Sequence, residues 1–336
     1  MNQINNMTQD KKIFGELTEL HAHVGSAVDP PIMWEIANDQ GIKLPTKNYW
    51  EFEKLITVAG TTTYQKYLDL FHWTELIQSS PEAMDKSIYS IASGAYRKNN
   101  ITTLEIRFNP MKRNRGGERD LDHIIQASIH GMEKAMLAYP IKVGLIFCLD
   151  RTFSPNLNKI LAQKAIKYYK RGVVGIDLAG PIDPKFDLYA LVDLISECKK
   201  EGLGITIHTG EATGPKEVLE VINLLSPHRI GHGVRAAEDY KVLNQIANRN
   251  IVLEVCPTSN LHTGVIKKLS DFQKIFAEFK KYKVPFTINT DGPEMLKTNL
   301  INEYQLLLDA NILDKEDVAA AIKSARAASF IKYGST

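Results

Sequence analysis

Eight short apolar segments alternate with helical segments along most of this chain, and that alternation restricts the folds open to it. The predicted strands are 17–23, 103–108, 143–148, 173–178, 204–208, 229–232, 251–255 and 285–291. From residue 81 onward, segments with helical periodicity separate them. Continuous apolar strands joined by helices predict a parallel sheet, and eight such units predict an α/β fold of the closed (β/α)8 TIM-barrel type. An open doubly wound sheet is the alternative, but no Gly-x-Gly-x-x-Gly phosphate loop follows a strand.

The length of 336 residues is more than one hydrophobic core usually supports. Barrels of this type, however, commonly run from about 200 to over 400 residues as one unit. We therefore predict a flexible polar leader over residues 1–12 and a single domain over 13–336. Residues 29–80 are helix-like and rich in aromatic side chains, which predicts a helical insertion after the first strand, near the active-site face. These aromatics, and His72 among them, are interpreted as packing residues, although such an insertion could also roof a pocket.

Composition excludes several classes of partner. The chain is 44% hydrophobic and 24% charged, with a formal net charge of +2, so no broad attraction to nucleic acid or anionic membrane is expected. No apolar run is long enough to span a bilayer and the polar start lacks the apolar core of a signal peptide, so the expected location is the cytoplasm. Cys148, Cys198 and Cys256 are odd in number and far apart, which favours small core residues over disulfides.

The first predicted strand ends in two histidines separated by one residue, His21 and His23. Side chains two apart on a strand point to the same face, so both imidazoles can bind one ion. Neutral imidazoles suit zinc, iron or nickel, but two ligands do not complete a site. A chance pair with a purely structural role is the alternative at this point.

Other candidate site residues fall at the carboxyl ends of the predicted strands, where barrels of this type place their chemistry. They are Asp177, Gly180, His208, Glu211, His232 and Asp291. Each has a simpler interpretation, since Glu211 could cap a helix, His232 could be a buried histidine and Asp291 could form a turn before Gly292. Taken together, three histidines and an aspartate on one rim predict a cation site, with a glutamate and a further histidine left for proton transfer.

The order of the motifs resembles one family. The motifs are His21-Ala22-His23, Gly175-Ile176-Asp177-Leu178-Ala179-Gly180, His208-Thr209-Gly210-Glu211, Arg229-Ile230-Gly231-His232-Gly233, Cys256-Pro257-Thr258-Ser259-Asn260 and Thr290-Asp291. Their order and spacing resemble those of the adenosine deaminase-like metal-dependent hydrolases of purines, whose fold is the (β/α)8 barrel. The resemblance covers most of the chain and implies a zinc-dependent hydrolytic deaminase that releases ammonia from adenosine or a similar aminopurine.

The resemblance also implies roles for the matching positions. One Zn²⁺ per chain would be held by His21, His23, His208 and Asp291. Glu211 would donate a proton to ring nitrogen N1, and His232 would orient and deprotonate the attacking water. The backbone of Gly180 would meet N3, and Asp177 of the same motif is included among the predicted substrate contacts.

Two departures from the family pattern concern the substrate. Val24-Gly25-Ser26 stands where members that act on adenosine usually have Leu-Asp-Gly, and Gly292 replaces their second aspartate. A loop after the second strand, 109–117, carries Arg113 and Arg115, whose planar cations suit phosphate or carboxylate. These features suggest an aminopurine nucleoside or nucleotide that is modified or anionic, such as an N6-substituted AMP or a 5′-modified adenosine. A solvated surface loop is the alternative for 109–117.

Two further alternatives remain open from the sequence. The same scaffold could break another bond, because barrel and metal do not fix the reaction. The chain could also be a non-catalytic purine-binding relative, although intact Glu211 and His232 argue against that. Deamination of polynucleotides is disfavoured, because the His-x-Glu and Pro-Cys-x-x-Cys motifs of those zinc enzymes are absent.

Overall fold

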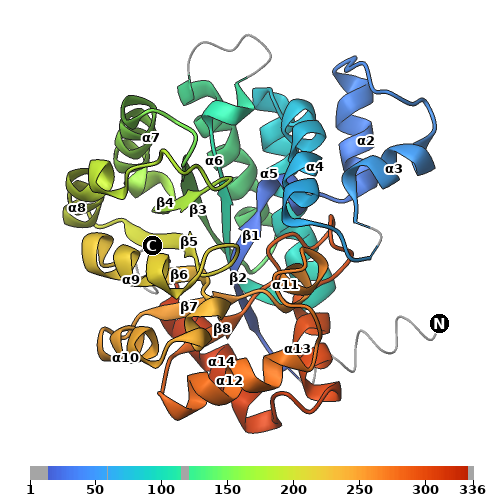
Figure 1. The fold of residues 1–336 in the computed structure, drawn as a ribbon. Coiled ribbons are helices and arrows are strands. Elements are labelled where there is room, and N and C mark those ends of the chain that lie inside the picture. Colours follow the sequence, from blue (N-terminus) through green and yellow to red (C-terminus); the bar gives the residue numbers. More distant parts are fainter. Residues whose placement is uncertain (1–13, 59, 115–120, 332–336) are drawn as a thin grey trace.

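The computed structural model describes residues 14–58, 60–114 and 121–331, and its centre is one parallel sheet (Figure 1). The strands are β1 (Leu17–His23), β2 (Ile101–Phe108), β3 (Lys142–Asp150), β4 (Val173–Ala179), β5 (Gly204–Thr209), β6 (Arg229–His232), β7 (Val252–Val255) and β8 (Phe286–Ile288). Neighbours in the sheet follow chain order, and a bridge between Ala22 and Asp291 joins β1 to the segment after β8. The predicted (β/α)8 barrel is confirmed.

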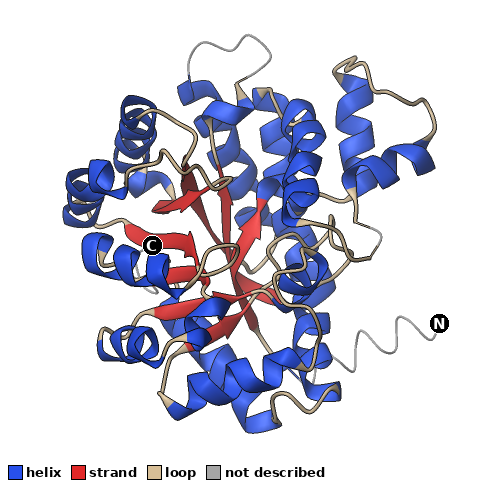
Figure 2. Cartoon of the chain, viewed as in Figure 1, coloured by secondary structure: helices blue, strands red, loops and turns tan. Residues whose placement is uncertain are grey.

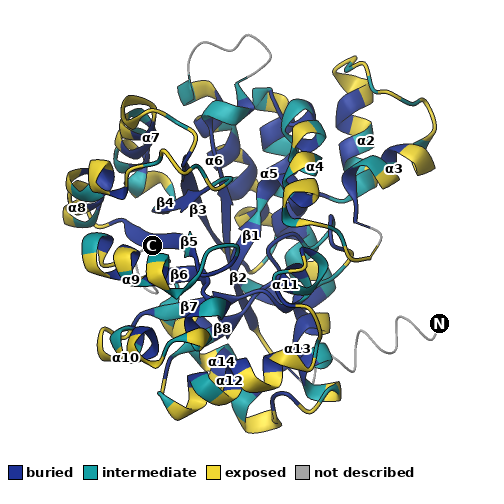
Figure 3. Ribbon diagram, in the orientation of Figure 1, coloured by how far each residue is buried: buried dark blue, intermediate teal, exposed yellow. Residues whose placement is uncertain are grey.

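Helices surround the strands on the outside of the barrel (Figure 2). They are α5 (Pro81–Asn99), α6 (Leu121–Ala138), α7 (Pro155–Lys167), α8 (Val192–Lys200), α9 (Pro215–Leu225), α10 (Tyr240–Asn248), α12 (Asp271–Lys281), α13 (Leu300–Asp309) and α14 (Lys315–Ala328). Local sequence sets their ends: Ser80 caps α5 ahead of a proline, and Asp314 and Asp317 form a capping box at α14. Figure 3 shows buried faces toward the strands and exposed faces toward solvent, as amphipathic helices require.

Apolar strand residues fill the barrel and the layer between strands and helices. Cys148, Cys198 and Cys256 are buried free thiols, which confirms their interpretation as core residues. At the amino-terminal end of the barrel, the ring of Phe330 lies 3.6 Å from the guanidinium carbon of Arg229. A Cβ on Gly204 would stand 2.1 Å from that ring, so only glycine allows this close approach.

Three helices follow β1 before the regular alternation begins. They are α2 (Pro30–Asp39), α3 (Tyr49–Ile56) and α4 (Tyr64–Ile77). In Figure 1, α2 and α3 stand at the edge of the molecule while α4 lies close to α5 and the strands. The expected helical content of 29–80 is therefore present, whereas the leader 1–12 lies outside the described residues and the domain division stays a prediction.

Three differences from the predicted elements concern the rim of the barrel. Strand β3 continues to Asp150, so that this carboxylate also reaches the rim, and β8 ends at Ile288. The segment Pro257–His262 forms helix α11, which was not predicted because six residues are too few to show a helical pattern. The proline in its first turn favours the start of a helix. Within the described ranges, no helix combines the length and the apolar character needed to cross a membrane.

Candidate active site

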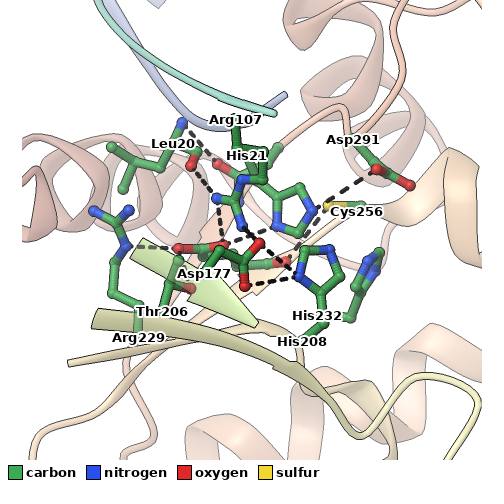
Figure 4. Close-up of polar contacts among 12 residues, drawn as sticks. Leu20, His21, Arg107, Asp177, Thr206, His208, Arg229, His232, Cys256 and Asp291 are labelled. Carbon is green, nitrogen blue, oxygen red and sulfur yellow. Dashed lines mark hydrogen bonds and ion pairs between the residues drawn. The ribbon is translucent and has the colours of Figure 1, made fainter. Parts of the chain in front are cut away.

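The predicted metal ligands meet at the carboxyl end of the barrel, and Figure 4 shows three of them, His21, His208 and Asp291. Nε2 of His23 and Nε2 of His208 are 3.2 Å apart. Oδ1 of Asp291 lies 3.7 Å from Nε2 of His21 and 3.5 Å from Nε2 of His23. Nε2 of His21 is buried and has no hydrogen-bond partner among the described residues. Three imidazole nitrogens and a carboxylate oxygen directed at one another fit the ligand preferences of zinc.

Two buried carboxylates hold the histidines in this orientation. Nδ1 of His21 lies 2.8 Å from Glu254 of β7, and Nδ1 of His208 lies 2.8 Å from Asp177 of β4. Arg107 of β2 donates to both carboxylates, at 2.9 Å to Glu254 and 3.0 Å to Asp177. Burial alone would raise the pKa of Glu254, but Arg107 first and then Arg229 lower it to about 2. Ionised acceptors on Nδ1 keep the proton there and leave Nε2 free for a metal.

Asp177, which the sequence predicts as a substrate contact, lies behind His208 and does not face the cavity. Its side chain is fully buried, and its carboxylate binds His208 and Arg107. His208 and Arg107 lower its pKa below the usual range despite burial, which keeps it ionised. This placement corrects the sequence prediction: Asp177 stands behind His208, where it fixes the imidazole instead of facing a ligand.

The protonation states also favour a metal on the imidazoles. Burial, with positive neighbours, lowers the pKa of His21, His23 and His232 well below the usual range, so these rings stay neutral. Cys256 lies close to His21 and His232 and offers an alternative ligand set. Burial raises the pKa of its thiol well above the ordinary value, which disfavours the thiolate that a metal needs. The set of three histidines and one aspartate is the better fit.

The backbone is strained where two of these side chains enter the site. His232 and Asp291 both have φ of 62°, in the left-handed region that non-glycine residues seldom adopt. Oδ2 of Asp291 accepts hydrogen bonds from Ser259 at 2.6 Å and from Tyr67 at 3.2 Å. The two oxygens of the Asp291 carboxylate thus have different partners: Oδ2 accepts from these hydroxyls, and Oδ1 faces His21 and His23.

Glu211 and His232 lie next to the ligand cluster. Oε2 of Glu211 is 3.7 Å from Nε2 of His232, and Nδ1 of His232 is 3.1 Å from the side-chain amide nitrogen of Asn260. Burial, and then the negative charge of Asp291, raise the pKa of Glu211 well above its ordinary value, while Arg151 acts weakly in the other direction. Burial therefore favours the protonated form of Glu211, and a carboxylic acid can donate a hydrogen bond.

A cavity of about 340 Å³ opens over these residues. Its lining includes Glu211, His232 and Asp291 of the barrel rim and several residues of helix α4. Most of the α4 residues in its lining share one helical face, and the full set is Tyr64, Gln65, Tyr67, Leu68, Asp69, Phe71, His72 and Glu75. The insertion thus roofs a pocket, and His72, predicted as packing, lies in the cavity wall.

Gly180 also lines the cavity, at the predicted position just past the end of β4. Its φ of 93° and the carboxylate of Asp150, 2.9 Å from the position of an added Cβ, both require glycine. Asp150 in turn is paired with Lys112, at 2.5 Å. The charge of Lys112 is therefore largely neutralised within the wall.

Arg113 is buried, at 2% exposure, in the wall of the cavity. It ends the short 3-10 helix η2 (Met111–Arg113), and its Nη2 lies 3.1 Å from the position of an added Cβ on Gly25. This burial contradicts the alternative of a solvated loop at Arg113. Arg115 lies outside the described residues.

The two glycines that depart from the family pattern stand where α4 enters the site. A Cβ on Gly25 would lie 2.7 Å from the ring of Phe71. A Cβ on Gly292 would lie 2.8 Å from the hydroxyl of Tyr67 and 2.9 Å from Ser26. Neither glycine has a left-handed backbone, so the obstacle to a larger residue is that these neighbouring side chains would have to shift.

Sequence reasoning missed several residues of the site: Tyr67, Arg107, Asp150 and Glu254. A signal existed for two of them, because Arg107 and Glu254 interrupt apolar strands, and a charge in a buried strand needs a partner. Tyr67 carried no comparable signal, since it is one of many aromatics in the insertion.

Comparison with known proteins bears on this geometry. The model of the adenosine deaminase family matches residues 17–335. The chain belongs to this family. It is 32% identical, over 294 residues, to adenosine deaminase of Clostridium botulinum (strain 657 / Type Ba4), covering 86% of each chain.

Solved structures share the fold at lower identity. Adenine deaminase from Arthrobacter aurescens superposes with a TM-score of 0.84 at 20% identity, covering 94% of each chain. Arabidopsis N6-mAMP deaminase superposes with a TM-score of 0.83 at 24% identity, covering 97% of this chain and 96% of that one.

As a family member, the chain is a hydrolase that acts on C–N bonds, and its family is metal-dependent. The alternative of a catalytically silent relative is set aside on this ground.

Proposed function

We propose that this chain is a zinc-dependent deaminase that hydrolyses the exocyclic amine of an aminopurine nucleoside or nucleotide. The observation that carries the proposal is the convergence of three imidazole nitrogens and Oδ1 of Asp291 beside a buried acid, Glu211. His21, His23, His208 and Asp291 would hold one zinc ion. A structure of an amidohydrolase from Burkholderia ambifaria with the same fold contains zinc, with a TM-score of 0.80 at 18% identity.

When bound, zinc supplies a Lewis acid that lowers the pKa of a water nucleophile. His232 acts as the base that takes the water proton at Nε2. This role requires the proton of the neutral ring on Nδ1, and a half-turn of the Asn260 amide would present its oxygen to that N–H. The low pKa of His232 keeps the ring unprotonated and ready to accept.

Glu211 acts on the purine. Attack at C6 breaks the aromaticity of the ring, so the ring must become electrophilic as the nucleophile arrives. The protonated carboxyl of Glu211 donates to N1 and neutralises the charge that develops there. Ammonia then leaves from the tetrahedral carbon, and water and aminopurine give oxopurine and ammonia.

We assign the remaining contacts to substrate choice. The backbone of Gly180 meets the purine edge, and the guanidinium of Arg113 in the cavity wall suits a phosphate or carboxylate on the substrate. Relatives of this fold differ in what they act on or bind, since one is an N6-mAMP deaminase and another Arabidopsis structure contains GMP. Buried Arg113 and the absence of carboxylates at Gly25 and Gly292 favour an anionic or N6-substituted nucleotide.

The test is a substrate panel with zinc-loaded protein: adenine, adenosine, AMP and N6-methyl-AMP. Conversion of the purine is followed by absorbance, and released ammonia or methylamine by a coupled amine assay. A kcat/KM of about 10⁴ M⁻¹s⁻¹ or more for one of them identifies the substrate class. Conversion without amine release would mean that another bond is broken, and no conversion of any member would contradict the proposal.

A further inference from the structure

Tyr67 connects the insertion to the candidate metal centre. Its hydroxyl lies 3.2 Å from Oδ2 of Asp291, and the residue is only 4% exposed. A phenol, with an ordinary pKa of about 10, is protonated at neutral pH, and a carboxylate can only accept. Tyr67 is therefore the donor, and it comes from α4, which is not part of the barrel.

The hydrogen bonds to Asp291 fix which oxygen faces the histidines. Ser259 of α11 donates to the same oxygen as Tyr67, at 2.6 Å. With Oδ2 held from two sides, Oδ1 is the oxygen near Nε2 of His21 and His23. Without these donors, the carboxylate could rotate about its Cβ–Cγ bond.

Gly292 shows that the position of the Tyr67 hydroxyl is built into the local packing. This hydroxyl occupies space 2.8 Å from the position of an added Cβ at residue 292. The backbone at Gly292 lies outside the left-handed region, so its conformation alone would accept another residue. The absence of a side chain at Gly292 therefore leaves room for the Tyr67 hydroxyl beside Asp291.

We propose that Tyr67 is a positioning residue that orients Asp291 and thereby makes the zinc affinity of the barrel depend on helix α4. This inference deepens the proposed function and rests on it, because it takes Asp291 as a zinc ligand. Groups that orient a metal ligand typically change metal affinity by about 10- to 100-fold when removed. An insertion that serves only as a pocket roof would leave metal affinity unchanged.

The first experiment measures the zinc dissociation constant of Tyr67→Phe by competition with a chromogenic chelator. We expect affinity to weaken by about 10- to 100-fold. The visible spectrum of the cobalt-substituted protein should also change, because it reports how the carboxylate binds the metal. Tyr64→Phe is the matched control: it removes a phenol from the same face of α4 that has no hydrogen bond to Asp291 among the described contacts. It should keep the wild-type zinc affinity and cobalt spectrum.

A double-mutant cycle keeps the inference testable if Tyr67→Phe also disturbs packing. Gly292→Ala should displace the Tyr67 hydroxyl and weaken zinc binding in the wild-type background. In the Tyr67→Phe background, the same change should cost much less zinc affinity, because the hydroxyl is already absent. The contact of residue 292 with Ser26 is common to both backgrounds and cancels in the cycle.

The outcomes separate this inference from the proposed function. Wild-type zinc affinity and an unchanged cobalt spectrum in Tyr67→Phe, or strictly additive effects in the cycle, would overturn the role of Tyr67 while leaving the deaminase intact. Failure of the wild-type protein to bind zinc would instead contradict the proposed function.

Discussion

The cavity has two walls of different origin. The barrel wall presents histidines and acids from strand ends, and buried carboxylates and Arg107 fix their orientation. The opposite wall consists of α4 and the turn at Arg113, where aromatic rings and a buried cation set the shape of the cavity. The first wall is thus organised by hydrogen-bond geometry and the second mainly by packing. We expect the barrel wall to determine the chemistry and the opposite wall to determine which substrate is accepted.

Removing a ligand from the barrel wall should have the largest effect. His208→Ala leaves two histidines and one aspartate, and we expect loss of bound zinc and of measurable deamination. Metal analysis of purified protein checks this. His72→Ala, on the opposite wall, is the control and should retain zinc; unchanged zinc in His208→Ala would refute the ligand assignment.

Glu211→Gln tests chemistry without removing a metal ligand. The amide keeps the size of the side chain but cannot transfer a proton, so kcat should fall on the order of 10²- to 10⁴-fold while zinc stays bound. Steady-state kinetics with parallel metal analysis measure both quantities. A variant that turns over at the wild-type rate would remove Glu211 from the mechanism.

The pH profile should show the state of Glu211. Its pKa is raised, so the protonated form is present below the pKa that holds in the folded protein and is lost as pH rises through it. The value of kcat/KM should therefore decline on the alkaline side, by about tenfold per pH unit once the acid is ionised. Among the described residues, its charged or titratable neighbours include Asp291, Arg151, His232, Tyr64 and Tyr67. In Glu211→Gln, the residual activity should lose this alkaline decline, and its persistence would assign the decline to another group.

The smallest effect should come from the opposite wall. Arg113→Ala should lower kcat/KM for a nucleotide by roughly tenfold, through KM, because a charged hydrogen bond is lost. Adenosine, which lacks the phosphate, should be affected little. Arg113→Lys keeps the charge without the planar fork and should fall between the two. If kcat/KM fell equally for nucleotide and nucleoside, Arg113 would contribute to packing of the cavity wall and not to the choice of substrate.

The two walls also differ in how well the sequence predicted them. The barrel and the positions of His21, His23, His208 and Asp291 on its rim followed from apolar periodicity, because parallel strands bring their carboxyl ends together. Asp177 was placed wrongly because a motif does not show which face of a strand end a side chain takes. Its partner, Arg107, lies two strands away in the sheet.

The opposite wall was not predictable in the same detail. Helical content between residues 29 and 80 could be read from composition, but the contact of Tyr67 with Asp291 spans 224 residues of sequence. Nothing local distinguishes Tyr67 from its aromatic neighbours. Gly25 and Gly292 were noticed as departures, and only the three-dimensional packing shows that Phe71 and Tyr67 occupy the space beside them.

Zinc-dependent deamination is tested most directly by measuring amine release from the best substrate of the panel. The release is measured before zinc is removed with a chelator, after its removal, and as zinc is returned stepwise. The stripped protein should be inactive, and activity should return in proportion to zinc, reaching its maximum at about one ion per chain. Undiminished activity in protein shown by metal analysis to contain no metal would contradict a zinc-dependent reaction.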